Sequence, residues 1–331
     1  MTVRVITLFV AGVSIGLASP AVSQLGLPPV GQAVGDIVGS VGRTVDRTVS
    51  SDLAQPVRSI AERAGDRLAR LADFARSNRA EIDLDDERQP ARRGVVLLLD
   101  PDTASLAKIQ QLGFSVRSVD GLAALGLDAT ELTIPDGRSL ADALKRLRAA
   151  MPDKSFTADQ IHFQSGAVQR SMPRATERKR VTIATPVGII DGGVGAVVPV
   201  VQSPGFAAGG AKPSDHGTAV ASLLRDAGVE KIVSADVYGR DPAGGSALAI
   251  ARALGWMVTE KVSVVSISLV GPRNALLERA IAGVTARGMV IVAAVGNDGP
   301  AAPPAYPASY PSVIAVTGVD GRQRALIEAG R

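Results

Sequence analysis

Five apolar runs alternate with helical segments in the second half of the chain, from Val181 onward. Most of the runs are continuous, which is typical of strands buried on both faces. Strands that alternate with helices predict a parallel sheet with helices on both faces, so we assign 181–331 to an α/β domain. The runs are VTIATPVGIID, KIVSADVYG, VSVVSISLV, MVIVAAVGN and SVIAVTGVD, and the helical segments are GTAVASLLRDAG, SALAIARALGWMVTEK and NALLERAIAGVTARG.

The preceding segment, residues 94–167, predicts a different architecture. A strand (GVVLLLD), a helix, two strands around a glycine-containing turn, a second helix and a last alternating strand follow one another. We place Ser139 at the N-cap of the second helix and Pro152 at its end. The βαββαβ order is typical of a ferredoxin-like α+β unit. His162 falls in the last strand, where we favour a half-buried structural role.

Three further segments complete the predicted organisation. Residues 1–23 combine one Arg, an apolar run and a small-x-small cleavage site, which indicates a secretory signal peptide, with an uncleaved anchor as the alternative. Residues 24–93 predict an extension with one amphipathic helix and, at 81–93 (EIDLDDERQPARR), a linker. We favour packing of this helix on the following domain over a position on a membrane surface. The polar, basic stretch 168–180 is predicted to be an exposed connector open to proteases.

Composition excludes several kinds of chemistry. The chain has no cysteine, which rules out disulfides, thiol nucleophiles and Cys-ligated zinc. Its 36 Lys and Arg residues are dispersed among 32 Asp and Glu residues, and nucleic-acid binding needs clustered positive charge, so we expect no nucleic-acid partner. Beyond the N-terminus, no apolar stretch approaches the ~20 residues of a membrane span.

Three polar residues stand where an α/β enzyme keeps its active site. Asp191 ends an apolar run, His216 begins a predicted helix, and Asn297 follows another apolar run. Each one alone has an ordinary structural explanation, as a cap or a turn. Together they predict a site beyond the carboxyl ends of the strands. A carboxylate there can orient an imidazole base, and a carboxamide can donate to an oxyanion.

Four blocks in the same region carry a resemblance. From about Val187 to Asp320, the chain resembles the subtilisin-like (S8) serine protease family, and the last block is long and specific. VGIIDGGV resembles the aspartate block and DHGTAVASLL the histidine block. VVSISLVGP resembles the strand that pairs with substrate, which implies substrate binding at Ser268, Leu269 and Val270. VIVAAVGNDGPAAPPAYPASYPSVIAVTGVD resembles the oxyanion block, which implies that role for Asn297.

The resemblance implies a secreted or periplasmic serine endopeptidase that is made as a zymogen and acts on polypeptides. Residues 94–167 then correspond to a prodomain, which assists folding and inhibits the enzyme. Autocleavage is expected between about Phe163 and Arg180. No cofactor is implied. Calcium is left open, because we find no clear loop of Asp and Asn ligands.

One element of the family is missing from the sequence. Family members carry the nucleophilic Ser, in a Gly-Thr-Ser-x-Ala block, roughly 155 residues after the His. This chain ends at Arg331 and has no such block, and Ser309 and Ser312 lie within the oxyanion block instead. We therefore expect a truncated and inactive form, with an incomplete domain and uncovered apolar sheet surface. The alternatives are a non-catalytic pseudoprotease that binds or inhibits peptides, and a surface-attachment protein acting through the 24–93 extension.

Overall fold

The computed structural model describes residues 67–166, 182–300, 302–326 and 328–330. All of them belong to the compact unit of the chain that begins at Arg58. The predicted signal peptide (1–23), most of the predicted extension and the predicted connector (168–180) lie outside the described residues. Within the described residues, no helix has the length and apolar character needed to cross a membrane.

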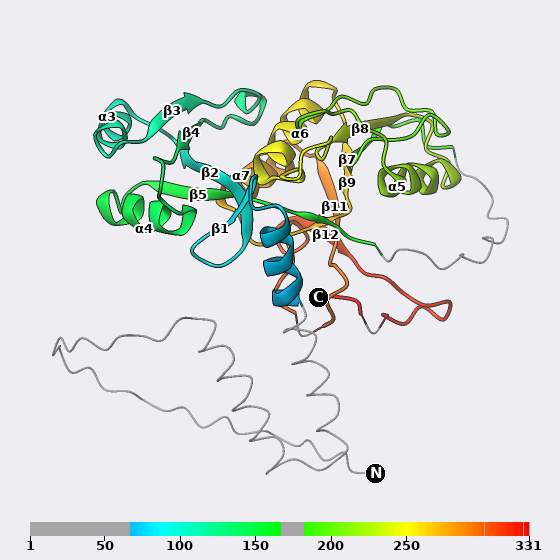
Figure 1. Cartoon of the computed structure of the whole chain (residues 1–331). Helices are drawn as coiled ribbons and strands as arrows, with labels where there is room; N and C mark the ends of the chain where they lie inside the picture. Colours follow the sequence, from blue (N-terminus) through cyan, green and yellow to red (C-terminus); the bar gives the residue numbers. More distant parts are fainter. Residues whose placement is uncertain (1–66, 167–181, 301, 327, 331) are drawn as a thin grey trace, which may run out of the picture. The chain divides into compact units, whose positions relative to one another are not determined.

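The sheet of the α/β region has five parallel strands (Figure 1). They are β7 (Val187–Asp191), β8 (Ile232–Asp236), β9 (Val264–Ile267), β11 (Val290–Ala294) and β12 (Val313–Val316). Their order is β12-β11-β9-β7-β8, and every neighbouring pair is parallel. The strand order changes direction at β7, which is the position where open parallel sheets form their sites.

Helices cover both faces of this sheet, as the sequence predicts. They are α5 (Asp215–Asp226), α6 (Ala247–Thr259) and α7 (Ala275–Ala286). Successive side chains of a strand point to opposite faces. Accordingly Ile189 packs in a cluster with Ala221 of α5, whereas Ile190 packs in the main core with Leu254 of α6.

A second, antiparallel sheet precedes the parallel one. It comprises β1 (Ile82–Leu84), β2 (Pro90–Leu99), β3 (Ser115–Ser118), β4 (Ala129–Thr133) and β5 (Ser155–Gln160), with α3 (Thr103–Gln111), α4 (Leu140–Ala150) and a short 3-10 turn at Ala123–Leu125. The four long strands run in the order β5-β2-β4-β3, which is the ferredoxin-like arrangement. Ser139 caps α4 by accepting from the N–H of Asp142.

Two local predictions need correction. The stretch predicted as a linker, 81–93, instead forms β1 and the start of β2, because the two segments pair with each other. The predicted last strand divides into β5 and β6 (Phe163–Gln164), and β6 pairs with β10 (Leu269–Val270) of the α/β region. Between them, His162 is fully buried rather than half-buried.

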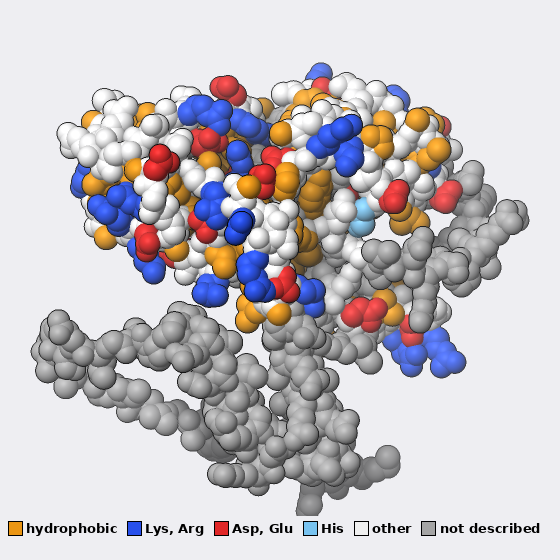
Figure 2. All heavy atoms as spheres, viewed as in Figure 1, with side chains coloured by type: hydrophobic (Ala, Val, Ile, Leu, Met, Phe, Trp, Pro, Cys, Tyr) orange, Lys and Arg blue, Asp and Glu red, His pale blue; other side chains and the backbone are white. Residues whose placement is uncertain are grey.

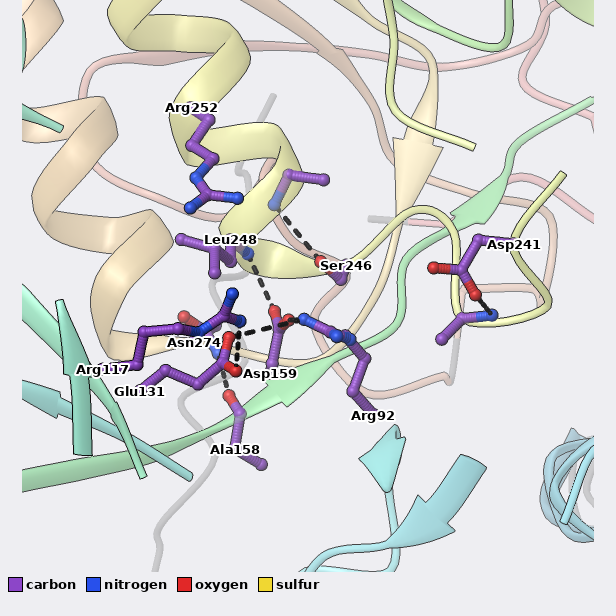
Figure 3. A network of polar contacts seen from close by, with 12 residues as sticks. Arg92, Arg117, Glu131, Ala158, Asp159, Asp241, Ser246, Leu248, Arg252 and Asn274 are labelled. Atoms are coloured by element: carbon purple, nitrogen blue, oxygen red, sulfur yellow. Dashed lines mark hydrogen bonds and ion pairs between the residues drawn. The ribbon is translucent and has the colours of Figure 1, made fainter. Parts of the chain in front are cut away.

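The antiparallel sheet docks through β5 on the first turns of α6 and α7 (Figure 3). The N–H of Leu248, in the first turn of α6, donates to the buried carboxylate of Asp159 over 2.8 Å. Asn274, the N-cap of α7, donates its side-chain amide to Ala158 O (2.9 Å) and Gln160 Oε1 (2.7 Å). Helix N-termini carry unpaired N–H groups and partial positive charge, so a carboxylate and a carboxamide suit these positions.

Replacing Asn274 by Ala is expected to lower the free energy of unfolding by ~3 kcal/mol, because the change removes an N-cap and several buried hydrogen bonds. Urea unfolding of the 331-residue chain measures the loss. Ser139→Ala is the matched control, since it removes an exposed N-cap that faces no second sheet, and we expect a loss of ~1 kcal/mol. Equal losses in the two variants would show that the Asn274 contacts to β5 contribute nothing.

Candidate active site

Asp191 is the last residue of β7 and is fully buried. Its Oδ1 accepts from the N–H of Gly192 (2.7 Å) and from Nε2 of Gln164 (3.0 Å). Both of its oxygens lie within hydrogen-bond distance of Nδ1 of His216, at 2.9 and 2.8 Å. A buried carboxylate requires such partners.

His216 reaches this carboxylate because α5 begins beside the end of β7. Ser214 caps the helix by accepting from the N–H of Gly217. A Cβ at Gly217 would lie 2.1 Å from the carbonyl oxygen of Gly192, so only glycine allows this approach. The side chain of His216 remains 22% exposed, and a histidine is visible at the surface in Figure 2.

The protonation of His216 follows from its partners. The hydrogen bond to Asp191 raises the pKa of His216 above its ordinary value, while partial burial opposes the rise. With Nδ1–H donating to Asp191, Nε2 of a neutral ring carries a lone pair. That nitrogen lies 3.2 Å from the carbonyl oxygen of Ser165, and this contact is a hydrogen bond only for the imidazolium. The pair can therefore accept and hold a proton, which is the task of a general base.

The three predicted substrate-binding residues pair with an extended segment of the chain itself. Leu269 pairs with Gln164 and Val270 with Phe163 in the antiparallel β6–β10 ladder. The N–H of Ser165 donates to the carbonyl oxygen of Ser268 over 2.8 Å. This pairing carries the peptide bond between Ser165 and Gly166 to the imidazole of His216.

Asn297 lies on the same cleft. It follows β11 by three residues, is exposed, and lines a cavity of about 610 Å³ together with Ser165 and Gly166. The structure thus brings Asp191 and His216 into direct contact. It places Asn297 beside the segment whose carbonyl oxygen contacts His216.

Sequence reasoning missed two contributors to this cleft. Gln164 donates to Asp191, and no feature of the sequence marks it. Asp298 accepts from Arg67 and Arg70, more than 200 residues earlier in the chain. By contrast, Ser214 stands two residues before the predicted helix start at His216 and directly before the observed α5, so a capping rule could have found it.

Among the described residues, no three His, Cys, Asp or Glu side chains form a group that could hold a metal ion. On the face shown in Figure 2, Lys and Arg side chains lie among Asp and Glu side chains rather than in one continuous patch.

Comparison with known proteins assigns part of the chain to a family. Residues 197–327 match the family model described as "Subtilase family". That part of the chain is a subtilase domain. The matched residues include His216 and Asn297, whereas Asp191 precedes them, so its place in the domain comes from β7 and from the contact with His216.

Curated proteins similar to this part of the chain include subtilisins. The chain is 33% identical over 156 residues to "Subtilisin DY" of Bacillus licheniformis, covering 41% of this chain and 57% of that protein. It is 36% identical over 115 residues to "Subtilisin Savinase" of Lederbergia lenta, covering 32% of this chain and 42% of that protein. The chain therefore spans about half the length of the curated relatives it matches.

Solved structures share the fold. Fervidolysin from Fervidobacterium pennivorans, described as a keratinolytic enzyme related to subtilisin, matches with a TM-score of 0.55 at 17% identity, over 73% of this chain and 46% of its own. The epidermin leader peptide processing serine protease of Staphylococcus aureus matches with a TM-score of 0.51 at 14% identity, over 72% of each chain. The matched 73% and 72% of this chain are more than the subtilase domain alone. The likeness in fold therefore includes part of the antiparallel sheet.

Proposed function

We propose that this chain contributes the Asp-His pair and the oxyanion donor of a secreted, zymogen-type serine endopeptidase. The observation that carries the proposal is the contact of His216 with buried Asp191 on one side and with a peptide carbonyl on the other. An Asp-His pair oriented toward a peptide bond suits nucleophilic hydrolysis.

In the proposed reaction, a polypeptide substrate extends along β10 and pairs with Ser268, Leu269 and Val270. His216 takes the proton of a Ser hydroxyl as the oxygen attacks the scissile carbonyl, and Asp191 stabilises the imidazolium. Asn297 donates a hydrogen bond to the oxyanion, an interaction worth about 3 kcal/mol in enzymes of this type. The imidazolium then protonates the leaving amine, and water hydrolyses the acyl-enzyme.

The antiparallel sheet and β6 act as an intramolecular inhibitor in this proposal. The pairing of β6 with β10 supports it, because β6 occupies the strand position of a substrate. The same geometry narrows the expected processing region from 163–180 to one bond. The carbonyl nearest to His216 belongs to Ser165, so we propose cleavage between Ser165 and Gly166.

The nucleophile comes, in this proposal, from a Ser-bearing segment that is not among the 331 residues. Exposed apolar side chains at and beyond β12 support a docking place for it. Ile314 is 53% exposed, Val316 44% and Val319 52%. Covering such side chains is favourable by roughly 25 cal/mol per Å² of apolar area. Secretion through residues 1–23 belongs to the same proposal.

The second candidate function is a pseudoprotease that binds or inhibits peptides. One observation favours it, namely that the printed sequence holds no candidate nucleophile block. The β10 edge could bind a peptide without cleaving it.

Fluorophosphonate labelling distinguishes the two functions. The 331-residue chain is expected to remain unlabelled. The chain is then joined to a Ser-bearing segment encoded downstream of codon 331, or taken from Subtilisin DY where none is encoded. We expect this completed chain to be labelled and to release a product that begins at Gly166.

Two controls make that result specific. Replacing the added Ser by Ala, or His216 by Ala, should abolish both labelling and release. A completed chain that folds but is neither labelled nor processed would favour the pseudoprotease. A product that begins at another residue would refute the assignment of the Ser165–Gly166 bond.

A further inference from the structure

A helix at 67–77 precedes both sheets in the sequence (Figure 1, blue helix). Arg67, Arg70 and Phe74 line the same cavity as Ser165 and Asn297. The likeness to subtilisins concerns the subtilase domain and does not explain this helix. Its contacts with the cleft therefore call for a physical explanation of their own.

Two ion pairs join the helix to the loop after β11. Nε of Arg67 donates to Oδ2 of Asp298 over 3.1 Å, and Nη2 of Arg70 donates to Oδ1 over 2.8 Å. Each carboxylate oxygen thus has its own guanidinium partner. Asp298 directly follows Asn297, so the helix is attached to the loop that carries the candidate oxyanion donor.

An aromatic contact joins the same helix to β6. The rings of Phe74 and Phe163 meet edge to face, with centroids 5.0 Å apart and planes at 83°. Both rings pack against one small apolar cluster, which includes Ile82 of β1, Ile161 between β5 and β6, and Ala243 of the subtilase domain. The helix therefore contacts β6 and also the loop after β11 that carries Asn297.

From these contacts we infer that helix 67–77 is a strap that holds β6 in the cleft. The cleft becomes free only when the two Asp298 ion pairs and the Phe74–Phe163 contact are broken. The inference rests on the proposed function in one respect, that the cleft is where substrate binds. Because the ion pairs are partly exposed, salt should weaken the strap.

Hydrogen exchange of the Ser165 amide tests the strap in the 331-residue chain, since that N–H donates to Ser268. R67Q/R70Q is expected to speed exchange three- to tenfold, because each partly exposed ion pair contributes modestly. F74A is expected to speed it about tenfold, through loss of ring contact and buried area. Combining the three changes should speed exchange further.

The matched control is R76Q. Arg76 lies on the same helix but pairs only with Asp73 among the described contacts. The Ser165 amide of R76Q should therefore exchange at the same rate as in the parent chain. Raising the salt concentration should accelerate exchange in the parent chain and leave R67Q/R70Q nearly unchanged. Reversing the charges, with R67D/R70D and D298R together, should restore slow exchange.

One result would overturn the strap. The strap is refuted if the Ser165 amide exchanges at the same rate in R67Q/R70Q and in F74A as in the parent chain. This holds whether or not the amides of helix 67–77 stay protected. This test needs no nucleophile, so its failure is distinct from a failure of labelling in the completed chain. The strap can be refuted while the endopeptidase proposal stands, and the reverse is also true.

Discussion

Replacing Asp191 by Asn is expected to lower the pKa of His216 in the 331-residue chain, because the carboxylate is the main cause of its raised value. In the completed chain the same change should reduce kcat by about four orders of magnitude, since the carboxamide stabilises the imidazolium poorly and favours the wrong tautomer. NMR titration of the ring protons measures the first effect, and peptide hydrolysis measures the second.

The chain supplies an internal control for this titration. It has only two histidines, and His162 lies in a separate buried environment, so its pKa should not respond to the Asp191 change. Asp191→Ala should lower the pKa of His216 as well. If His216 titrates identically in all three chains, the contact with Asp191 does not govern its protonation, and its assignment as the oriented base is wrong.

Acid is expected to release β6 from the cleft. Burial lowers the pKa of His162 from 6.5 to about 4, and neither ring nitrogen has a hydrogen-bond partner among the described residues. The docked state therefore binds fewer protons than the released state between these two pH values. Docking is at full strength above about pH 6.5 and weakens as the pH falls toward 4, by a total on the order of 3 kcal/mol.

The pH dependence of protection at the Ser165 amide measures this release. His162→Phe keeps a ring but cannot be protonated, so its protection should vary much less between pH 7 and 4.5. The variant comparison is needed because two other groups act in the opposite direction on acidification. Burial raises the pKa of Asp159, and the contact with Asp191 raises the pKa of His216, whose imidazolium donates to Ser165. Parallel pH profiles for the two chains would exclude His162 as the acid-sensitive group.

The sequence predicts the α/β part of the fold well, for a clear physical reason. Strands buried on both faces need continuous apolar runs, and β7, which ends such a run, is buried at every residue. Helix starts follow local chemistry too, as the cap at Ser139 shows. The position of Asp191 and His216 at neighbouring elements follows from one rule, that sites lie beyond the carboxyl ends of parallel strands.

What the sequence could not predict depends on distant partners. β1 has only three residues, IDL, which is too short to show a strand pattern in the sequence. It becomes a strand only by pairing with β2. The break between β5 and β6 arises because the segment leaves one sheet and pairs with β10, a partner more than 100 residues away. The Asp298 ion pairs likewise join residues that no local pattern connects. Local sequence patterns indicate secondary-structure propensity, whereas these three features depend on tertiary contacts.

The two residues between β5 and β6 have a consequence for the kinetics of an active form. Only Ile161 and His162 separate β5 from β6. After cleavage at Ser165, the N-terminal part would therefore still hold β6 close to the conformation in which it binds the cleft. Such a preshaped product rebinds with little entropy loss. Activation should therefore begin with a lag that lengthens as protein concentration rises, and end only when the severed part is itself destroyed.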